Sequence, residues 1–77
     1  MHITYDSESD AAYIRIGGPI AAGQATQQLH SIQTPGGNGE IILDFDDAGH
    51  LLGFEILFAS SVLAPEVLTS VTKLGGI

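Results

Sequence analysis

The chain of 77 residues is long enough for one domain, and without cysteine it forms no disulfide bond and offers no thiolate ligand to a metal. Nine acidic residues against two basic ones give a formal net charge of −7, which disfavours binding to nucleic acid and to anionic membranes. Hydrophobic residues make up 44% of the chain, a large share for a domain this small, so we expect association with a second copy of the chain or with a small basic protein.

The N-terminal residues and the longest apolar segment together predict a cytoplasmic protein. Met1 to Asp6 lack the basic segment and apolar run of a secretory signal. The most apolar stretch, Leu51 to Leu57, contains Gly53 and Glu55 and is far too short to span a bilayer. Membrane insertion is therefore not expected.

Two alternating segments near the N-terminus predict a β-hairpin over His2 to Tyr5 and Ala11 to Ile16. The polar residues between them, 6–10, accept hydrogen bonds from nearby backbone amides and favour a turn. Gln24 to Gln33 alternates only weakly and is rich in amide side chains, as is typical of an edge strand. The sequence leaves open whether this segment pairs with the sheet.

A second hairpin is predicted over Glu40 to Asp46 and Leu51 to Phe58, joined by residues 47–50. Period-two alternation places the following residues inward: Ile41, Leu43, Phe45, Leu52, Phe54, Ile56 and Phe58. The opposite face is half apolar, and its apolar residues are Ile42, Leu51 and Leu57. Because both faces carry apolar side chains, both need to be covered.

A C-terminal helix is expected over about 60–74. Ser60 or Ser61 is suited to capping its first turn, and Pro65 suits a first helical position. Gly75 is a natural stop. The apolar residues at helical spacing form one stripe: Leu63, Val67, Val71 and Leu74. The predicted fold is thus of the α+β class, an antiparallel β-meander of four to five strands with a C-terminal α-helix packed on one face.

The single helix leaves one sheet face uncovered. We therefore predict that Ile42, Leu51 and Leu57 form an interface for a homodimer or higher homo-oligomer. The expected function is that of a non-enzymatic protein-interaction module, a single domain over residues 1–77.

The strongest local motif for metal chemistry lies between Asp44 and Glu55. Counted from Asp44, acids stand at positions one and three, glycine at six and glutamate at twelve, as in the calcium loop of an EF-hand. Position five is Ala48, which offers no side-chain oxygen, and both flanks alternate with the period of strands rather than helices. An Asp-Gly hairpin turn is therefore the favoured interpretation, and no cofactor is expected.

The alternative function is a small metal-dependent hydrolase using Asp44, Asp46, Glu55 and a histidine. Asp44 and Asp46 share a strand face, and Glu55 is predicted on the same sheet face across the hairpin. Acids on an outer sheet face are also typical of a solvated surface. The histidines stand at no ligand spacing; they are His2, His30 and His50. We therefore assign no catalytic residue, and Asp44, Asp46 and Glu55 stay as metal-ligand candidates.

The order of several short motifs resembles a known family. These motifs are Tyr5-Asp6, Asp10-Ala11, Tyr13-Ile14, Leu43-Asp44-Phe45-Asp46, Gly49, Gly53-Phe54-Glu55-Ile56-Leu57 and Ala59-Ser60. Together they are similar to the pattern of the small bacterial family called domain of unknown function 2283, over Met1 to about Leu63. The resemblance implies a small meander-plus-helix domain and no reaction, cofactor or catalytic residue. Through members encoded beside small proteins, it also implies an antitoxin-like role as the partner of a basic protein.

Overall fold

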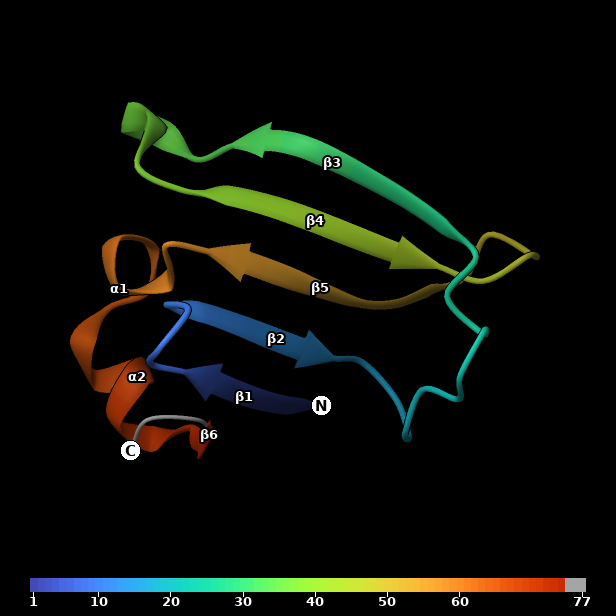
Figure 1. Cartoon of the computed structure of the whole chain (residues 1–77), viewed down its shortest axis with the longest axis horizontal. Helices are drawn as coiled ribbons and strands as arrows, with labels where there is room; N and C mark the ends of the chain where they lie inside the picture. The colour runs from blue at the N-terminus through green and yellow to red at the C-terminus, as the bar shows by residue number, and fades with distance from the viewer. Residues whose placement is uncertain (75–77) are drawn as a thin grey trace.

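The computed structural model describes residues 1–74, which form one six-stranded sheet in the order β3-β4-β5-β2-β1-β6 with two short helices at one end (Figure 1). The elements are β1 (His2–Asp6), β2 (Ala11–Arg15), β3 (Gln27–Gln33), the 3-10 turn η1 (Pro35–Gly37), β4 (Glu40–Phe45), β5 (Leu51–Leu57), α1 (Ala59–Val62), α2 (Pro65–Ser70) and β6 (Thr72–Leu74). Strands β1 to β5 pair antiparallel, and β6 pairs parallel with β1. The predicted α+β class with an antiparallel sheet is confirmed.

Strand β3 confirms the expected edge strand within the uncertain segment 24–33. It lies at one end of the sheet order, pairs only with β4, and all seven of its residues are exposed. A β-bulge interrupts the pairing between Leu29 and Ile32, where Ser31 adopts a left-handed φ of 66°. Such a bulge twists an edge strand and disfavours the addition of another strand to it.

The single helix expected over about 60–74 is wrong in extent. The chain forms the two short helices instead, and between them Leu63 and Ala64 have extended backbone angles. Pro65 explains the interruption, because a residue before proline avoids the helical region, while proline itself suits the first turn of α2 as predicted. After Val71 the chain returns to the sheet as β6. The predicted stop at Gly75 lies outside the described residues.

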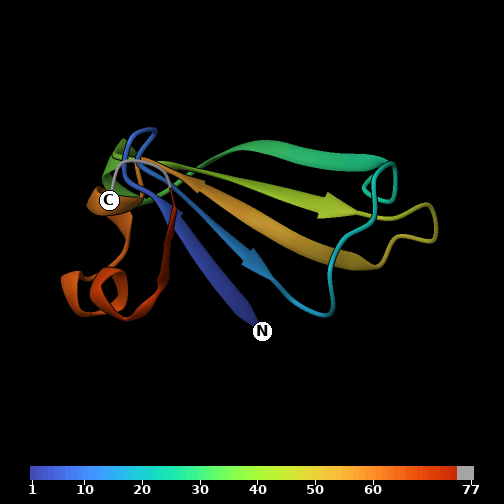
Figure 2. The same cartoon turned by 60° about the horizontal axis from the view of Figure 1, so that its bottom comes forward.

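The two sheet faces differ in what they carry. On the face that we call the inner face, Ala12 lies opposite Ile56 and Ile14 lies opposite Phe54, and β4 continues the apolar layer. Ala12, Ile14, Ile56 and Ala59 form the buried core, against which Val62 and Leu63 pack. Figure 2 shows both helices on one side of the sheet, at the end where β5 finishes. The helices therefore cover the inner face at one end only.

The helices are short. Among residues 1–74, none has the length and apolar character that crossing a bilayer requires.

Candidate functional site

A hydrogen-bonded cluster lies on the outer face, the face opposite the core. The Tyr13 hydroxyl donates to Oδ2 of Asp44 at 2.8 Å, and the Gln28 side-chain amide donates to Oδ1 of the same carboxylate at 2.7 Å. Asp44 is only 9% exposed. Since Tyr13 belongs to β2 and Asp44 to β4, the tyrosine side chain reaches across the intervening strand β5.

Gly53 provides the space for this crossing. A Cβ at this position would lie 2.5 Å from the Ile14 carbonyl oxygen and 2.7 Å from the Tyr13 hydroxyl oxygen. Both separations are shorter than real Cβ contacts. Gly53 therefore lets the Tyr13 ring lie against the β5 backbone and reach Asp44.

A second cluster joins the β1–β2 turn to the first helix. Oδ1 of Asp10 accepts hydrogen bonds from the Tyr5 hydroxyl at 2.8 Å and the Ser60 backbone amide at 3.0 Å, and Oδ2 accepts one from the Ser60 hydroxyl at 2.7 Å. The Asp10 carbonyl accepts the Ala59 amide at 2.9 Å. The predicted capping by Ser60 or Ser61 is wrong, because the first turn of α1 has no side-chain cap of its own and the carboxylate of Asp10 serves that end instead.

The electrostatics of Asp10 follow from these contacts. Burial raises the pKa of Asp10, but the hydrogen bonds from the Ser60 hydroxyl, from Tyr5 and from the Ser60 backbone favour the ionised form more strongly. The pKa of Asp10 therefore lies below its ordinary value. The pKa of Tyr5 is raised, first by its hydrogen bond to Asp10 and then by burial and by the charges of Asp10 and Asp6.

The metal-ligand candidates are not gathered into one group. Asp44 and Glu55 do share the outer face, as predicted, since Asp44 lies opposite Gly53 and Glu55 lies opposite Ile42. Asp46 follows the end of β4, and its Oδ1 accepts the backbone amides of residues 48 and 50 at 3.0 and 2.9 Å. The predicted hairpin turn is thereby confirmed. Within residues 1–74, no three histidine, aspartate or glutamate side chains lie close enough to hold a metal ion.

The histidines are dispersed. His2 belongs to β1 and His30 to β3, and three strands separate these two in the sheet. His50 lies in the β4–β5 turn with its Nδ1 3.2 Å from Oδ2 of Asp46. The turn that folds residue 50 back onto residue 46 is not visible in the sequence spacing alone.

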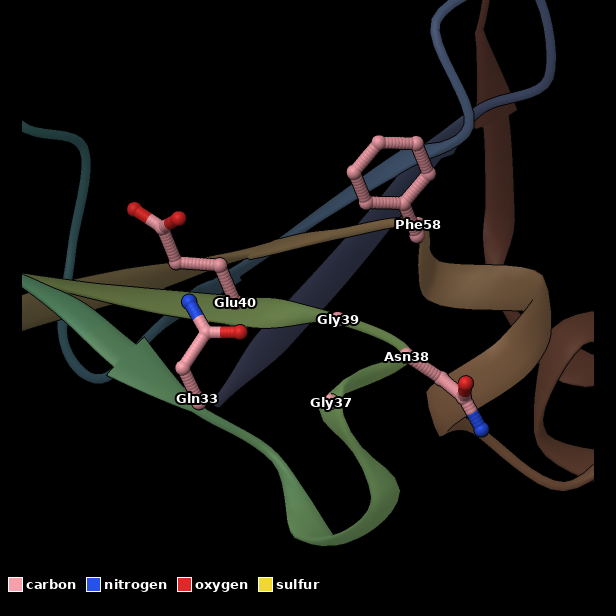
Figure 3. Close-up of a pocket in the computed structure, with 6 residues that line it drawn as sticks. All are labelled: Gln33, Gly37, Asn38, Gly39, Glu40 and Phe58. Atoms are coloured by element: carbon pink, nitrogen blue, oxygen red, sulfur yellow. The ribbon is translucent and has the colours of Figure 1, made fainter.

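A hollow of about 350 Å³ lies near the helical end of the outer face. Its lining residues come from the end of β3, the end of η1 and the loop after it, the start of β4 and the residue that follows β5: Gln33, Gly37, Asn38, Gly39, Glu40 and Phe58. In Figure 3 the Phe58 ring, the Glu40 carboxylate and the Gln33 amide project on the same side of the ribbon, while the Asn38 side chain points away from them. The hollow thus combines an aromatic ring, a carboxylate and an amide.

The predicted inward direction of the Phe58 side chain is wrong, and sequence reasoning did not identify Phe58 as a site residue. Strand alternation predicted an inward side chain, whereas the residue is 61% exposed and has a left-handed φ of 58°. Alternation applies only while the strand continues, and β5 ends at Leu57 where the chain turns into α1. No pattern in the sequence marks this end.

One family pattern matches the chain. The family described as Protein of unknown function (DUF2283) matches residues 2–60. The chain belongs to this family. No curated protein and no solved structure matches it significantly. The matched segment of this DUF2283 protein contains β1 to β5 and the start of α1, hence both the Tyr13–Asp44 cluster and the Asp10–Ser60 cluster, whereas α2 and β6 follow it.

The structure also places the three predicted interface residues of the DUF2283 protein. Ile42 and Leu57 are half-buried on the outer face, in β4 and β5. Leu51 is 39% exposed at the start of β5, beside a register shift opposite Phe45. Their role as an interface stays a prediction, which is taken up below.

The Tyr13–Asp44 hydrogen bond predicts an alkaline titration. Burial, the hydrogen bond to Asp44 and the charges of Asp44 and Glu55 raise the pKa of Tyr13 from 10.0 to about 12. Because the folded-state pKa is the higher one, the stability that Tyr13 contributes is present below pH 10 and is lost as the pH rises toward 12.

We expect ultraviolet titration of the folded protein to show tyrosinate absorbance from Tyr13 only near pH 12. Tyr13→Phe should remove that step and leave the absorbance of Tyr5, the other of the two tyrosines. A Tyr13 midpoint at pH 10 in the folded protein would contradict the hydrogen bond.

Proposed function

We propose that this DUF2283 protein is a non-enzymatic protein-interaction module that forms a homodimer through its inner sheet face. The supporting observation is that the helices cover only one end of an apolar face. Leu29 is 57% exposed and Ile32 is 39% exposed, although both belong to the inner side of the β3–β4 pair. We call the uncovered part the open inner face; it consists of Leu29, Ile32, Leu43, Phe45 and Leu52.

The charge distribution permits two copies to meet on this face. Strand alternation places the charged residues of β1, β2, β4 and β5 on the outer face: Asp6, Arg15, Glu40, Asp44 and Glu55. The remaining acids lie in turns or in α2: Glu8, Asp10, Asp46, Asp47 and Glu66. A net charge of −7 opposes self-association in general, but contact between two open inner faces brings no strand carboxylates together.

The small core favours a second copy as the occupant. Four residues are buried in it, two of them alanines, and no large side chain among residues 1–71 is completely buried. A domain of this size commonly gains stability by association. Two sheets pack face to face at about 10 Å, and a two-fold axis between them makes the same apolar patch serve both partners. Because the helices cover one end of the inner face, a second sheet can stack only on the open inner face.

Size-exclusion chromatography with light scattering, at roughly 50 µM, tests the proposal on a protomer of 8.0 kDa. We expect twice that mass for the wild type and a monomer for Leu29→Glu, since a carboxylate in an apolar interface would be desolvated without a partner. Leu29 is mostly exposed within the protomer, so the fold should persist.

Ile42→Lys is the control on the outer face, because Ile42 lies opposite Glu55 and belongs to the interface predicted from the sequence. If the open inner face is the interface, Ile42→Lys stays dimeric. A dimer that only Ile42→Lys dissociates would assign association to Ile42, Leu51 and Leu57 instead. A monomeric wild type would contradict both surfaces.

A further inference from the structure

We infer that the hollow beside Phe58 binds the cationic side chain of a basic polypeptide, an arginine or a lysine. This site is on the outer face and is formed within one protomer, so it does not depend on the proposed homodimer. Three features of the described residues carry the inference: an exposed aromatic ring, a carboxylate beside it and the backbone strain that holds the ring there.

The exposure of Phe58 serves no purpose in packing the core. The residue is 61% exposed, and its φ of 58° is unfavourable for a bulky side chain. Neighbouring hydrogen bonds hold this conformation: the Ser61 amide donates to the Phe58 carbonyl at 2.9 Å, and Asp10 binds the two residues between them. Strained residues held by their surroundings are frequent at binding sites. The fold thus keeps an aromatic ring at the surface at an energetic cost.

Glu40 sets the charge preference of the hollow. It is the only ionisable residue among those that line it, and its carboxylate accepts the Ser31 backbone amide at 3.2 Å. A cation between an aromatic ring and a carboxylate interacts favourably with both, and a guanidinium group also donates hydrogen bonds to amide oxygens such as that of Gln33. The net charge of −7 attracts a basic chain to the surface as a whole.

The dimensions and ligands of the hollow favour a side chain over a metal ion or a large molecule. Its volume of about 350 Å³ is at the small end of the range for ligand pockets, about 300–1,000 Å³. With one carboxylate in the lining, the hollow lacks the several hard oxygen ligands that a calcium or magnesium ion requires. An organic cation needs only one carboxylate and benefits from the ring.

The first test is a titration of the 15N-labelled protein with a capped tripeptide that has a central arginine, followed by NMR. We expect saturable shifts confined to the amides around residues 37–40 and 58, with a dissociation constant on the order of 1 mM. The same tripeptide with citrulline in place of arginine has nearly the same shape and no charge, and it should bind at least tenfold more weakly. Equal binding of the two peptides, or no shifts with the arginine peptide at roughly 10 mM, would overturn the inference.

Two variants test whether Phe58 and Glu40 bind the arginine peptide. Phe58→Asn and Glu40→Gln should each weaken binding of the arginine peptide at least tenfold. Asparagine tolerates the left-handed conformation, so Phe58→Asn should melt at the same temperature as the wild type or higher, which separates loss of binding from loss of folding. Glu8→Gln removes an exposed carboxylate from another turn and should leave binding unchanged. If Glu8→Gln weakens binding as much as Glu40→Gln, general electrostatic attraction explains the result and the site is refuted.

Discussion

Replacing Gly53 with alanine is expected to destabilise the protein by about 3–5 kcal/mol, through overpacking and the loss of a partner for a buried carboxylate. The new methyl group would contact the Ile14 carbonyl oxygen and the Tyr13 hydroxyl, so β2 and β5 must separate or the tyrosine must leave Asp44. A domain of this length has a total stability of about 4–12 kcal/mol. Urea denaturation followed by circular dichroism measures the change, and the variant should be largely unfolded at moderate temperature.

Gly17→Ala is the matched control for this prediction. No atom lies within 4 Å of a Cβ at residue 17, and its backbone is not left-handed. We expect a change of about 0.5 kcal/mol or less in the free energy of unfolding. Equal stability of the two variants would show that the β5 backbone does not need glycine for the Tyr13 crossing.

Replacing Asp10 with alanine is expected to cost about 2–4 kcal/mol, or roughly 10–25 °C in Tm, because its carboxylate accepts three hydrogen bonds that hold α1 to the β1–β2 turn. The left-handed φ of 54° at this position adds to the cost for alanine. Asp10→Asn keeps an acceptor and tolerates that backbone, so about 1 kcal/mol is expected. Glu8→Ala in the same turn should change stability by about 0.5 kcal/mol or less. Thermal denaturation at neutral pH compares the series.

The pH dependence of the same series provides a second readout. The pKa of Asp10 in the folded protein is lower than its ordinary value of 3.8, so its contribution to stability is present above that pH and is lost as the pH falls through the folded-state pKa. The stability difference between the wild type and Asp10→Asn should therefore shrink on acidification below about pH 4. If the stability difference between the wild type and Asp10→Asn stays constant at lower pH, the hydrogen bonds do not act by stabilising the charged form of Asp10.

The residues that carry the family resemblance serve mainly to hold the fold. Asp10 binds the start of α1 and accepts a hydrogen bond from Tyr5, and Tyr13 and Asp44 connect β2 to β4 over Gly53. Each is a tyrosine, carboxylate or glycine of a type that also occurs in active sites. Their hydrogen-bonding capacity is used in contacts within the domain. The Phe58 hollow is formed by other residues, whereas Leu43 and Phe45 of the open inner face belong to the family motifs.

The sequence alone determined the features that depend on neighbouring residues. Alternation located β1, β2, β4 and β5 to within about a residue or two at each end, and it assigned Ile56 to the core side. The Asp-Gly hairpin turn over residues 47–50 and the edge character of β3 were also predicted correctly. Pro65 is a local signal for the break between α1 and α2, because the residue before a proline avoids the helical conformation, whereas the apolar stripe favours one continuous helix.

Tertiary structure decided the features that depend on distant pairing. Tyr13 meets Asp44 across 31 positions of sequence, and Ser60 meets Asp10 across 50, since β2 pairs with β5 and not with β3, the strand that follows it in the chain. The exposure of Phe58 follows from where β5 leaves the sheet, and the open inner face follows from where the short helices stop. Alternation within a strand is a local property of the chain, whereas the order of strands, their ends and the cover over them result from contacts between distant segments.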